Sequence, residues 1–179
     1  MTRFRRAFQI LAILWAIAVP VAVFAASRRA SSVSSAGYVF ALVVYGIGRL
    51  VCHQRPERSF YLFGAPLAVC ARCAGIYAGA ALMAMVEGLR TDPAVPRSIN
   101  VGGAAGGVAR RILLLAFAPT AATLFYEWTT HQMPGHWTRA ASGAVLGAAI
   151  AWIVCRASRA DAVVKNSPPS PPSQKPLLS

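Results

Sequence analysis

Residues 67–86 read LAVCARCAGIYAGAALMAMV. This run is almost wholly apolar, and it has the length of about 20 residues that a helix needs to cross a bilayer. One arginine, Arg72, and two cysteines, Cys70 and Cys73, lie near its beginning. The sequence therefore predicts a membrane-spanning helix whose amino-terminal end carries reactive groups.

Four further apolar runs predict an all-α integral membrane helical bundle of about five transmembrane helices. They cover residues 7–26, 36–51, 112–128 and 140–155. Hydrophobic residues make up 56% of the chain and charged residues 13%, about half of the charged fraction of an ordinary soluble domain. Two pairs of glycines, Gly75 with Gly79 and Gly143 with Gly147, have the spacing that lets helix backbones approach closely.

The formal net charge of +13 raises nucleic acid as a partner. The arginines, however, stand in short clusters between the apolar runs, where membrane proteins carry anchors and orientation signals. No basic stripe with interleaved aromatic residues is found. We expect a lipid bilayer as the partner and no nucleic acid.

The chain divides into a signal-anchor span with its loop (residues 1–35), a four-span core (36–157) and a Pro-rich tail (158–179). The first span ends in VFAAS (23–27), which resembles a signal-peptide cleavage site, but its apolar run is longer than such peptides carry, so we expect an uncleaved anchor. The tail contains SPPSPPSQKP (167–176), a composition that cannot bury a core and is expected to be disordered.

Three of the four cysteines lie in two segments that one short loop connects, CHQRPERSF (52–60) and VCARCAG (69–75). A prediction that Pro66 is an early helical residue puts Cys70 and Cys73 in the first turns of the third span, on one helix face. The loop between the last two spans carries His131 and His136 and returns to the same side. We therefore expect three cysteines and all three histidines at one membrane face.

This donor set predicts a metal site, with zinc as the ion, because thiolate and imidazole are the ligands of tetrahedral zinc centres. The nitrogen ligand stays open among the three histidines. The predicted ligands are Cys52, His53, Cys70 and Cys73, with His131, His136 and Glu127 as additional candidates.

Other interpretations of the same residues remain. Cys70 and Cys73 have the spacing of a reversible disulfide pair, with Cys52 as a third exchange partner, which is the chemistry of a membrane thiol-disulfide oxidoreductase. A non-enzymatic transport or assembly role is a further alternative.

Cys155, alone in the fifth span, is expected to be a small buried hydrophobe. No familiar hydrolase or kinase motif is present, so whether the protein is an enzyme stays open.

Arg72 is costly in lipid unless it is paired or reaches the surface. Glu127 lies near the matching depth in the fourth span, and we predict a structural ion pair between the two. The functional alternative makes Glu127 a general base or proton relay beside the metal.

The two cysteine-bearing segments closely resemble the predicted membrane proteins catalogued as domain of unknown function 2085. The resemblance is dense over residues 52–79 and looser over 119–147. It implies a multi-span protein, supplies no activity, and implies an acid in many members where this chain has Thr123. The shared motif residues it implies are Cys52, His53, Gln54, Arg58, Cys70, Arg72, Cys73 and Gly75.

Orientation is predicted from the arginines, whose number is nearly equal on the two sides of a five-span chain. Arg3, Arg5 and Arg6 before the first span favour a cytoplasmic amino terminus in a multi-pass protein of the cell membrane. With five spans, the cysteines share that side. We then expect metal ligation or free thiols rather than a permanent disulfide.

Overall fold

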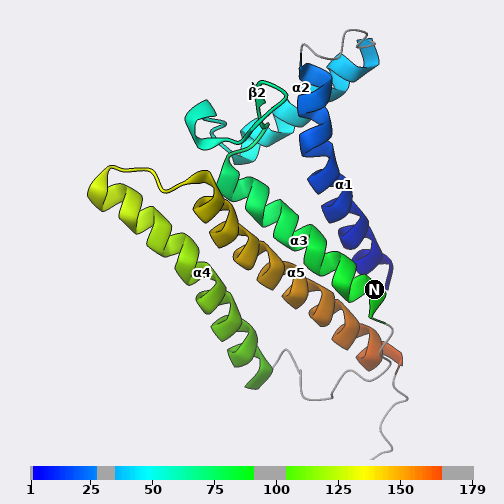
Figure 1. The fold of residues 1–179 in the computed structure, drawn as a ribbon. Helices are drawn as coiled ribbons and strands as arrows, with labels where there is room; N and C mark the ends of the chain where they lie inside the picture. The colour runs from blue at the N-terminus through cyan, green and yellow to red at the C-terminus, as the bar shows by residue number, and fades with distance from the viewer. Residues whose placement is uncertain (1, 28–34, 91–103, 167–179) are drawn as a thin grey trace, which may run out of the picture.

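The computed structural model describes residues 2–27, 35–90 and 104–166 (Figure 1). These residues are mainly helical, which confirms the all-α fold class. The elements are α1 (Thr2–Ala26), α2 (Ser35–Val51), a single 3-10 turn η1 (Pro56–Arg58), β1 (Tyr61–Leu62), β2 (Ala65–Pro66), α3 (Ala71–Leu89), α4 (Ala104–Thr130) and α5 (His136–Asn166).

A small antiparallel hairpin stands where the sequence predicts the start of the third span. Leu62 pairs with Ala65 across Phe63 and Gly64, and both turn residues have positive φ, 53° and 82°. Such two-residue turns match the twist of paired strands and favour glycine. The prediction that Pro66 is helical is therefore wrong: Pro66 lies in β2, and α3 begins only at Ala71.

Helices α3 and α5 lie side by side and run in the same direction, and the two glycine pairs form their contact (Figure 1). Added Cβ atoms on Gly75, Gly79, Gly143 and Gly147 would lie 2.0–2.2 Å from the backbone oxygens of Ala140, Ala144, Arg72 and Ile76, respectively. Any side chain there would force the helices apart. The predicted close approach is confirmed, and the structure adds that the two pairs pack against each other.

Helix α1 runs antiparallel to α3. Gln9, near the beginning of α1, donates a hydrogen bond of 3.0 Å from Nε2 to the backbone oxygen of Ala84, near the end of α3. Further along α1, Trp15 packs edge-on against Tyr77 at 5.9 Å between ring centroids. Helix α1 is thus an integral part of the bundle, with its amino terminus beside the end of α3.

The carboxyl-terminal part of α1 packs against α2 and the segment that precedes α3. We call this end of the molecule the thiol end, because Cys52 belongs to its core. The core residues are Val19, Ala22, Val23, Ala41, Val44, Cys52, Leu67, Ala68 and Val69. Helix α2 lies across this end, as Figure 1 shows, and Tyr45 donates a hydrogen bond of 2.7 Å to the Pro66 oxygen.

This placement corrects the predicted path of the chain. A full crossing by α2, as its apolar run predicts, would put the amino terminus on the side of the cysteines. In the structure α1 ends at the thiol end and α2 stays there, so Arg3, Arg5 and Arg6 begin α1 at the opposite end. An apolar run shows that a helix can enter a membrane but not where the helix packs.

Three of the described helices are long and apolar enough to cross a membrane: Arg3–Ala26, Gly107–Thr130 and His136–Arg159. The apolar helix Ser35–Val51 is shorter, and α3 runs beside α5 but carries Arg72 and Glu87. Helix α5 continues to Asn166, so residues 158–166 of the predicted tail are helical. Residues 167–179 lie outside the described part of the chain.

Candidate metal centre and arginine-lined pocket

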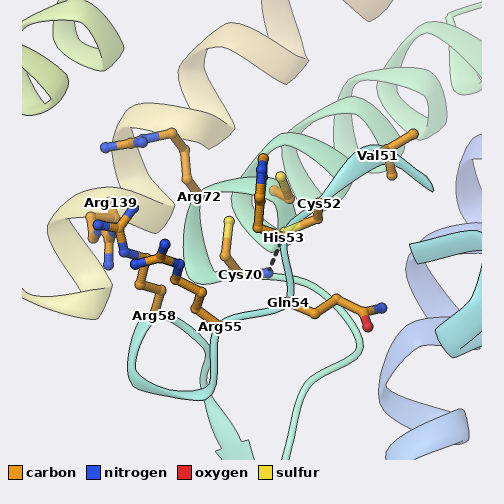
Figure 2. Close-up of a pocket in the computed structure, with 10 residues that line it drawn as sticks. Val51, Cys52, His53, Gln54, Arg55, Arg58, Cys70, Arg72 and Arg139 are labelled. Carbon is orange, nitrogen blue, oxygen red and sulfur yellow. Dashed lines mark hydrogen bonds between the residues drawn. The ribbon is translucent and has the colours of Figure 1, made fainter. Parts of the chain in front are cut away.

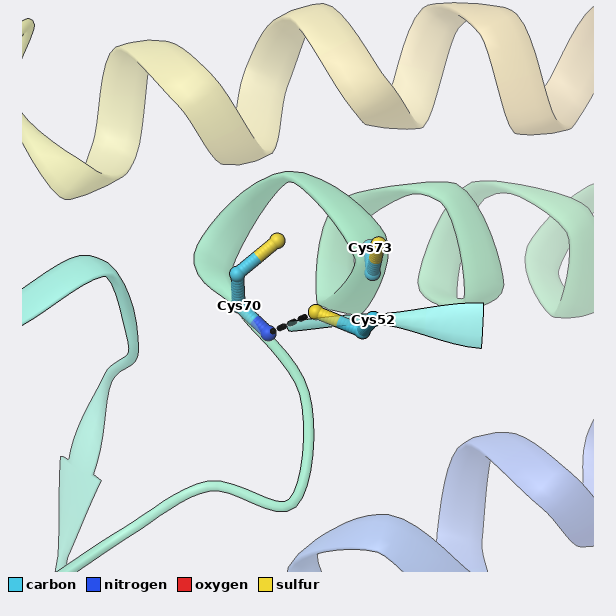
Figure 3. Close-up of side chains that lie close together, drawn as sticks. All are labelled: Cys52, Cys70 and Cys73. Carbon is cyan, nitrogen blue, oxygen red and sulfur yellow. Dashed lines mark hydrogen bonds between the residues drawn. The ribbon is translucent and has the colours of Figure 1, made fainter. Parts of the chain in front are cut away.

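Three sulfur atoms meet at the beginning of α3 (Figure 3). Cys52 follows the last residue of α2, Cys70 is the N-cap of α3, and Cys73 lies in the first turn of α3. Their Sγ atoms all lie within 4.8 Å of one another. The backbone N–H of Cys70 also donates to Sγ of Cys52 at 3.2 Å. We call these three residues the thiol cluster.

Gln54 holds the thiol cluster together from the side of α2. Its Nε2 donates two hydrogen bonds of 2.7 Å, to the backbone oxygens of Tyr45 and Ala68. Gly48 of α2 lets this helix approach the segment before α3, since an added Cβ on Gly48 would lie 2.5 Å from the backbone oxygen of Ala68. The end of α2, and with it Cys52, is thereby fixed beside the start of α3. Gln54 follows Cys52 and His53 in the sequence, and no sequence pattern predicted its two hydrogen bonds.

The thiols of the cluster are sheltered, and the pKa values of Cys70 and Cys73 shift in opposite directions, lowered at Cys70 and raised at Cys73. Cys52 is buried, Cys70 and Cys73 are half-buried, and all four cysteines of the chain are free thiols. A hydrogen bond with the Cys73 side chain outweighs the effect of burial and lowers the pKa of the Cys70 thiol to about 5. Cys70 is therefore a thiolate at neutral pH, which is the form that binds metal or attacks a disulfide.

The histidines lie at the same end of the molecule but do not join the sulfurs. His53 is exposed and lines the pocket beside them. Nε2 of His136 lies 3.2 Å from the backbone oxygen of Glu57, and its ring packs against Phe60. His131 is exposed just after α4. Among the described residues, no histidine nitrogen lies within 4.8 Å of all three sulfurs, and the nitrogen ligand stays a prediction.

A pocket of about 320 Å³ opens in front of the thiol cluster (Figure 2). The three cysteines and His53 line one part of this pocket, and all its other ionisable side chains are arginines. They are Arg55, Arg58, Arg72 and Arg139. We call this space the arginine pocket.

Glu127 of α4 pairs with three of the arginines that line the arginine pocket. Its carboxylate oxygens lie 2.9 Å from Arg72 Nη2, 3.0 Å from Arg139 Nε and 3.8 Å from Arg58 Nη1. The predicted pair of Arg72 with Glu127 is confirmed. Thr123 accepts a further hydrogen bond of 3.2 Å from Arg72, so Arg72 also reaches the position where relatives are expected to carry an acid.

A second ionic cluster, which no sequence pattern predicted, lies at the opposite end of the bundle. The side chain of Glu87 is fully buried, and its carboxylate lies 3.1 Å from Arg90, 3.2 Å from Arg159 and 3.9 Å from Arg156. We call this end the Glu87 end. Cys155 of α5 is buried there, apart from the thiol cluster, as expected for an isolated cysteine.

These features define a helical protein with membrane-spanning character, a three-thiol cluster and a basic pocket. The chain belongs to the family described as predicted membrane protein (DUF2085), whose model matches residues 52–153, more than half of the chain. The matched region begins at Cys52 and contains the whole thiol cluster and the arginine pocket except Val51.

Two archaeal proteins are similar over the core of the motif. An uncharacterized protein of Methanocaldococcus jannaschii, MJ1492, is 55% identical over 38 residues, which are 21% of this chain and 24% of that protein. An uncharacterized protein of Methanothermobacter thermautotrophicus is 53% identical over 32 residues, 18% of this chain and 29% of that protein. The matches thus span less than a third of each relative. No solved structure matches the chain.

Proposed function

We propose that this membrane protein holds a metal ion, zinc, at the thiol end, with Cys52, Cys70 and Cys73 as ligands. The observation that supports the proposal is the meeting of three Sγ atoms within 4.8 Å of one another. Zn–S bonds of about 2.3 Å in a tetrahedral site separate the sulfurs by about 3.8 Å. A side-chain movement of roughly 1 Å therefore suffices to close the three thiols on one ion.

The fourth ligand faces the arginine pocket. His53 lines this pocket and is the histidine best placed to swing toward the ion. Glu127 is a poorer candidate because three arginines hold its carboxylate. If no histidine binds, the position takes water, as in catalytic zinc sites.

The proposed ion has a structural effect whichever group is the fourth ligand. Cys52 directly follows α2, whereas Cys70 and Cys73 lie at the beginning of α3, so one ion would add a further link to the hydrogen bonds of Gln54 that already join these two elements. Metal binding of this kind contributes folding free energy, because the unfolded chain offers no preformed site. The hydrogen bond from the Cys70 amide to Cys52 Sγ orients this sulfur as a ligand.

The test is metal analysis of the protein purified in detergent under mild reductant. We expect about one zinc per chain and three thiols that react with an alkylating reagent only after chelation. Single Cys52→Ser, Cys70→Ser and Cys73→Ser variants should each lose most of the zinc. Cys155→Ala is the matched control, since Cys155 lies away from the cluster, and it should retain full zinc content. Equal zinc content in all four variants would refute the proposal.

A second candidate function is thiol-disulfide exchange, which the thiolate form of Cys70 favours. In this reaction the Cys70 thiolate attacks a disulfide of a substrate protein and forms a mixed disulfide. The Cys73 thiol then loses its proton and its sulfur displaces the substrate sulfur from Cys70, so that the substrate leaves as a dithiol and Cys70 and Cys73 become a disulfide. Purified protein without metal, with two thiols that react only after reduction, would support this function over the metal centre.

A further inference from the structure

The charges around the arginine pocket do not balance. Four arginines line it, and Glu127, which lies beside it, is the single carboxylate that pairs with them in the described part of the chain. The excess is three positive charges before the thiols are counted. Three thiolates around a divalent metal would contribute one negative charge, which leaves an excess of about two.

The arginines also have unused hydrogen-bonding capacity. The side chain of Arg55 lines the pocket and makes no ion pair or hydrogen bond with any described residue. The Nε atoms of Arg58 and Arg72 are buried and have no hydrogen-bond acceptor within the described ranges. Buried guanidinium nitrogens are costly without an acceptor. The side chain of Arg55 therefore offers donors, and the four arginines together offer positive charge, to a ligand that would supply both acceptors and negative charge.

We propose that the arginine pocket binds a phosphate group, either free phosphate or the phosphate of a lipid headgroup. Arginine presents a planar fork of donors that fits the oxygens of phosphate in pairs. A dianionic phosphate has the charge that neutralises the remaining excess beside a metal-loaded cluster. A single carboxylate would leave part of that charge uncompensated.

The size and position of the pocket agree with this ligand. A volume of about 320 Å³ is at the lower end of the range for small-molecule sites, and it accommodates a phosphate with a small attached group. Cys70 lies on its wall as the N-cap of α3 and makes no side-chain cap. The positive end of the α3 helix dipole lies at this wall and adds to the attraction of an anion. This inference does not require the proposed metal, because the arginines carry it.

Arg55 gives the sharpest test, because its side chain pairs with no carboxylate and its loss leaves the ion pairs of Glu127 intact. Inorganic phosphate binding is measured by calorimetry on the full chain in neutral detergent, at fixed ionic strength. We expect Arg55→Gln to weaken phosphate binding about tenfold, as loss of a charge-assisted hydrogen bond does. Arg49→Gln, which removes an arginine outside the pocket, should change it less than about twofold.

Two further measurements separate the phosphate site from the metal centre. Zinc content and melting temperature of Arg55→Gln should equal those of the unchanged protein, which shows that the variant is folded. Phosphate binding is then measured again after chelation. Phosphate binding that persists after chelation and still depends on Arg55 supports the arginine pocket as the phosphate site. Binding that disappears with the metal in every variant would assign the phosphate to the ion and overturn the proposal.

The source of the phosphate is distinguished with bicelles that contain either phosphatidic acid or only phosphatidylcholine. Competition by phosphatidic acid that depends on Arg55 assigns the site to a lipid headgroup. Binding of inorganic phosphate that phosphatidic acid does not displace assigns it to a soluble ligand. Acetate that binds as tightly as phosphate, or no Arg55-dependent binding of any of these probes, overturns the proposal.

Discussion

Gly75 of α3 lies so close to Ala140 of α5 that an added Cβ would stand 2.0 Å from the Ala140 backbone oxygen. Since this oxygen belongs to the backbone, it cannot move aside as the end of a side chain would. The four glycines of this contact bring the beginning of α3, with the thiol cluster, beside the beginning of α5, with Arg139. Helix packing here determines the geometry of the site.

The first prediction concerns this contact. Gly75→Ala should destabilise the protein by roughly 1–3 kcal/mol, the usual cost of overpacking a tight interface, and should lower the melting temperature in detergent. Gly46→Ala is the control, because an added Cβ on Gly46 of α2 meets nothing within 4 Å. It should leave stability unchanged or raise it slightly. Equal effects of the two substitutions would contradict the observed packing of α3 on α5.

The second prediction concerns the ion pairs of Glu127. Its side chain is 7% exposed and its carboxylate meets three arginines, so Glu127→Gln leaves guanidinium groups without compensation. Breaking a buried ion pair in this way costs about 3–5 kcal/mol. Thermal unfolding in detergent measures the loss. Glu57→Gln, at an exposed position that forms no ion pair in the described structure, should have no measurable effect.

The third prediction concerns the pH dependence of Cys70. Its lowered pKa of about 5 keeps the thiolate populated at all pH values well above 5, and protonation as the pH falls through 5 removes it. In metal-free reduced protein, alkylation of Cys70 identified by mass spectrometry should therefore stay fast at pH 6 and fall to half near pH 5. Cys73→Ala removes the hydrogen bond that lowers this pKa and should move the midpoint toward the ordinary value of 9.0. A midpoint near 9 in the unchanged protein would show that the hydrogen bond is not formed.

The fourth prediction concerns membrane orientation. Because α1 begins at the Glu87 end, the amino terminus and the thiol cluster should lie on opposite sides of the membrane. The described arginines of the Glu87 end are Arg3, Arg5, Arg6, Arg90, Arg110, Arg111, Arg156 and Arg159, and those of the thiol end are Arg49, Arg55, Arg58, Arg72 and Arg139. The more basic end faces the cytoplasm by the positive-inside rule, so the thiols should face outward.

A membrane-impermeant maleimide applied to intact cells checks this orientation. Metal-free protein with the Cys155→Ala substitution should be labelled at the thiol cluster. A variant with all four cysteines replaced and Thr2→Cys added should be labelled only after the cells are opened. Labelling of both proteins from the same side would contradict the placement of α1. Labelling of neither would contradict an outward-facing thiol cluster.

Local sequence patterns were sufficient to predict several features of this protein. Long apolar runs with few charges predict membrane helices because each run satisfies its own backbone hydrogen bonds and matches the thickness of the bilayer. Glycine spacing predicted a close helix contact, and a short connecting segment predicted that Cys52 lies near Cys70 and Cys73. The ion pair of Arg72 with Glu127 followed from the cost of an unpaired charge at that depth.

Only the tertiary structure decided which end of α1 lies beside the thiols, that α2 lies across that end, and that Arg58 and Arg139 share Glu127 with Arg72. The buried cluster around Glu87 and the two hydrogen bonds of Gln54 also appeared only there. These features are contacts between residues far apart in the chain. Hydropathy and spacing describe what one segment prefers, whereas such contacts depend on how several helices share the same space.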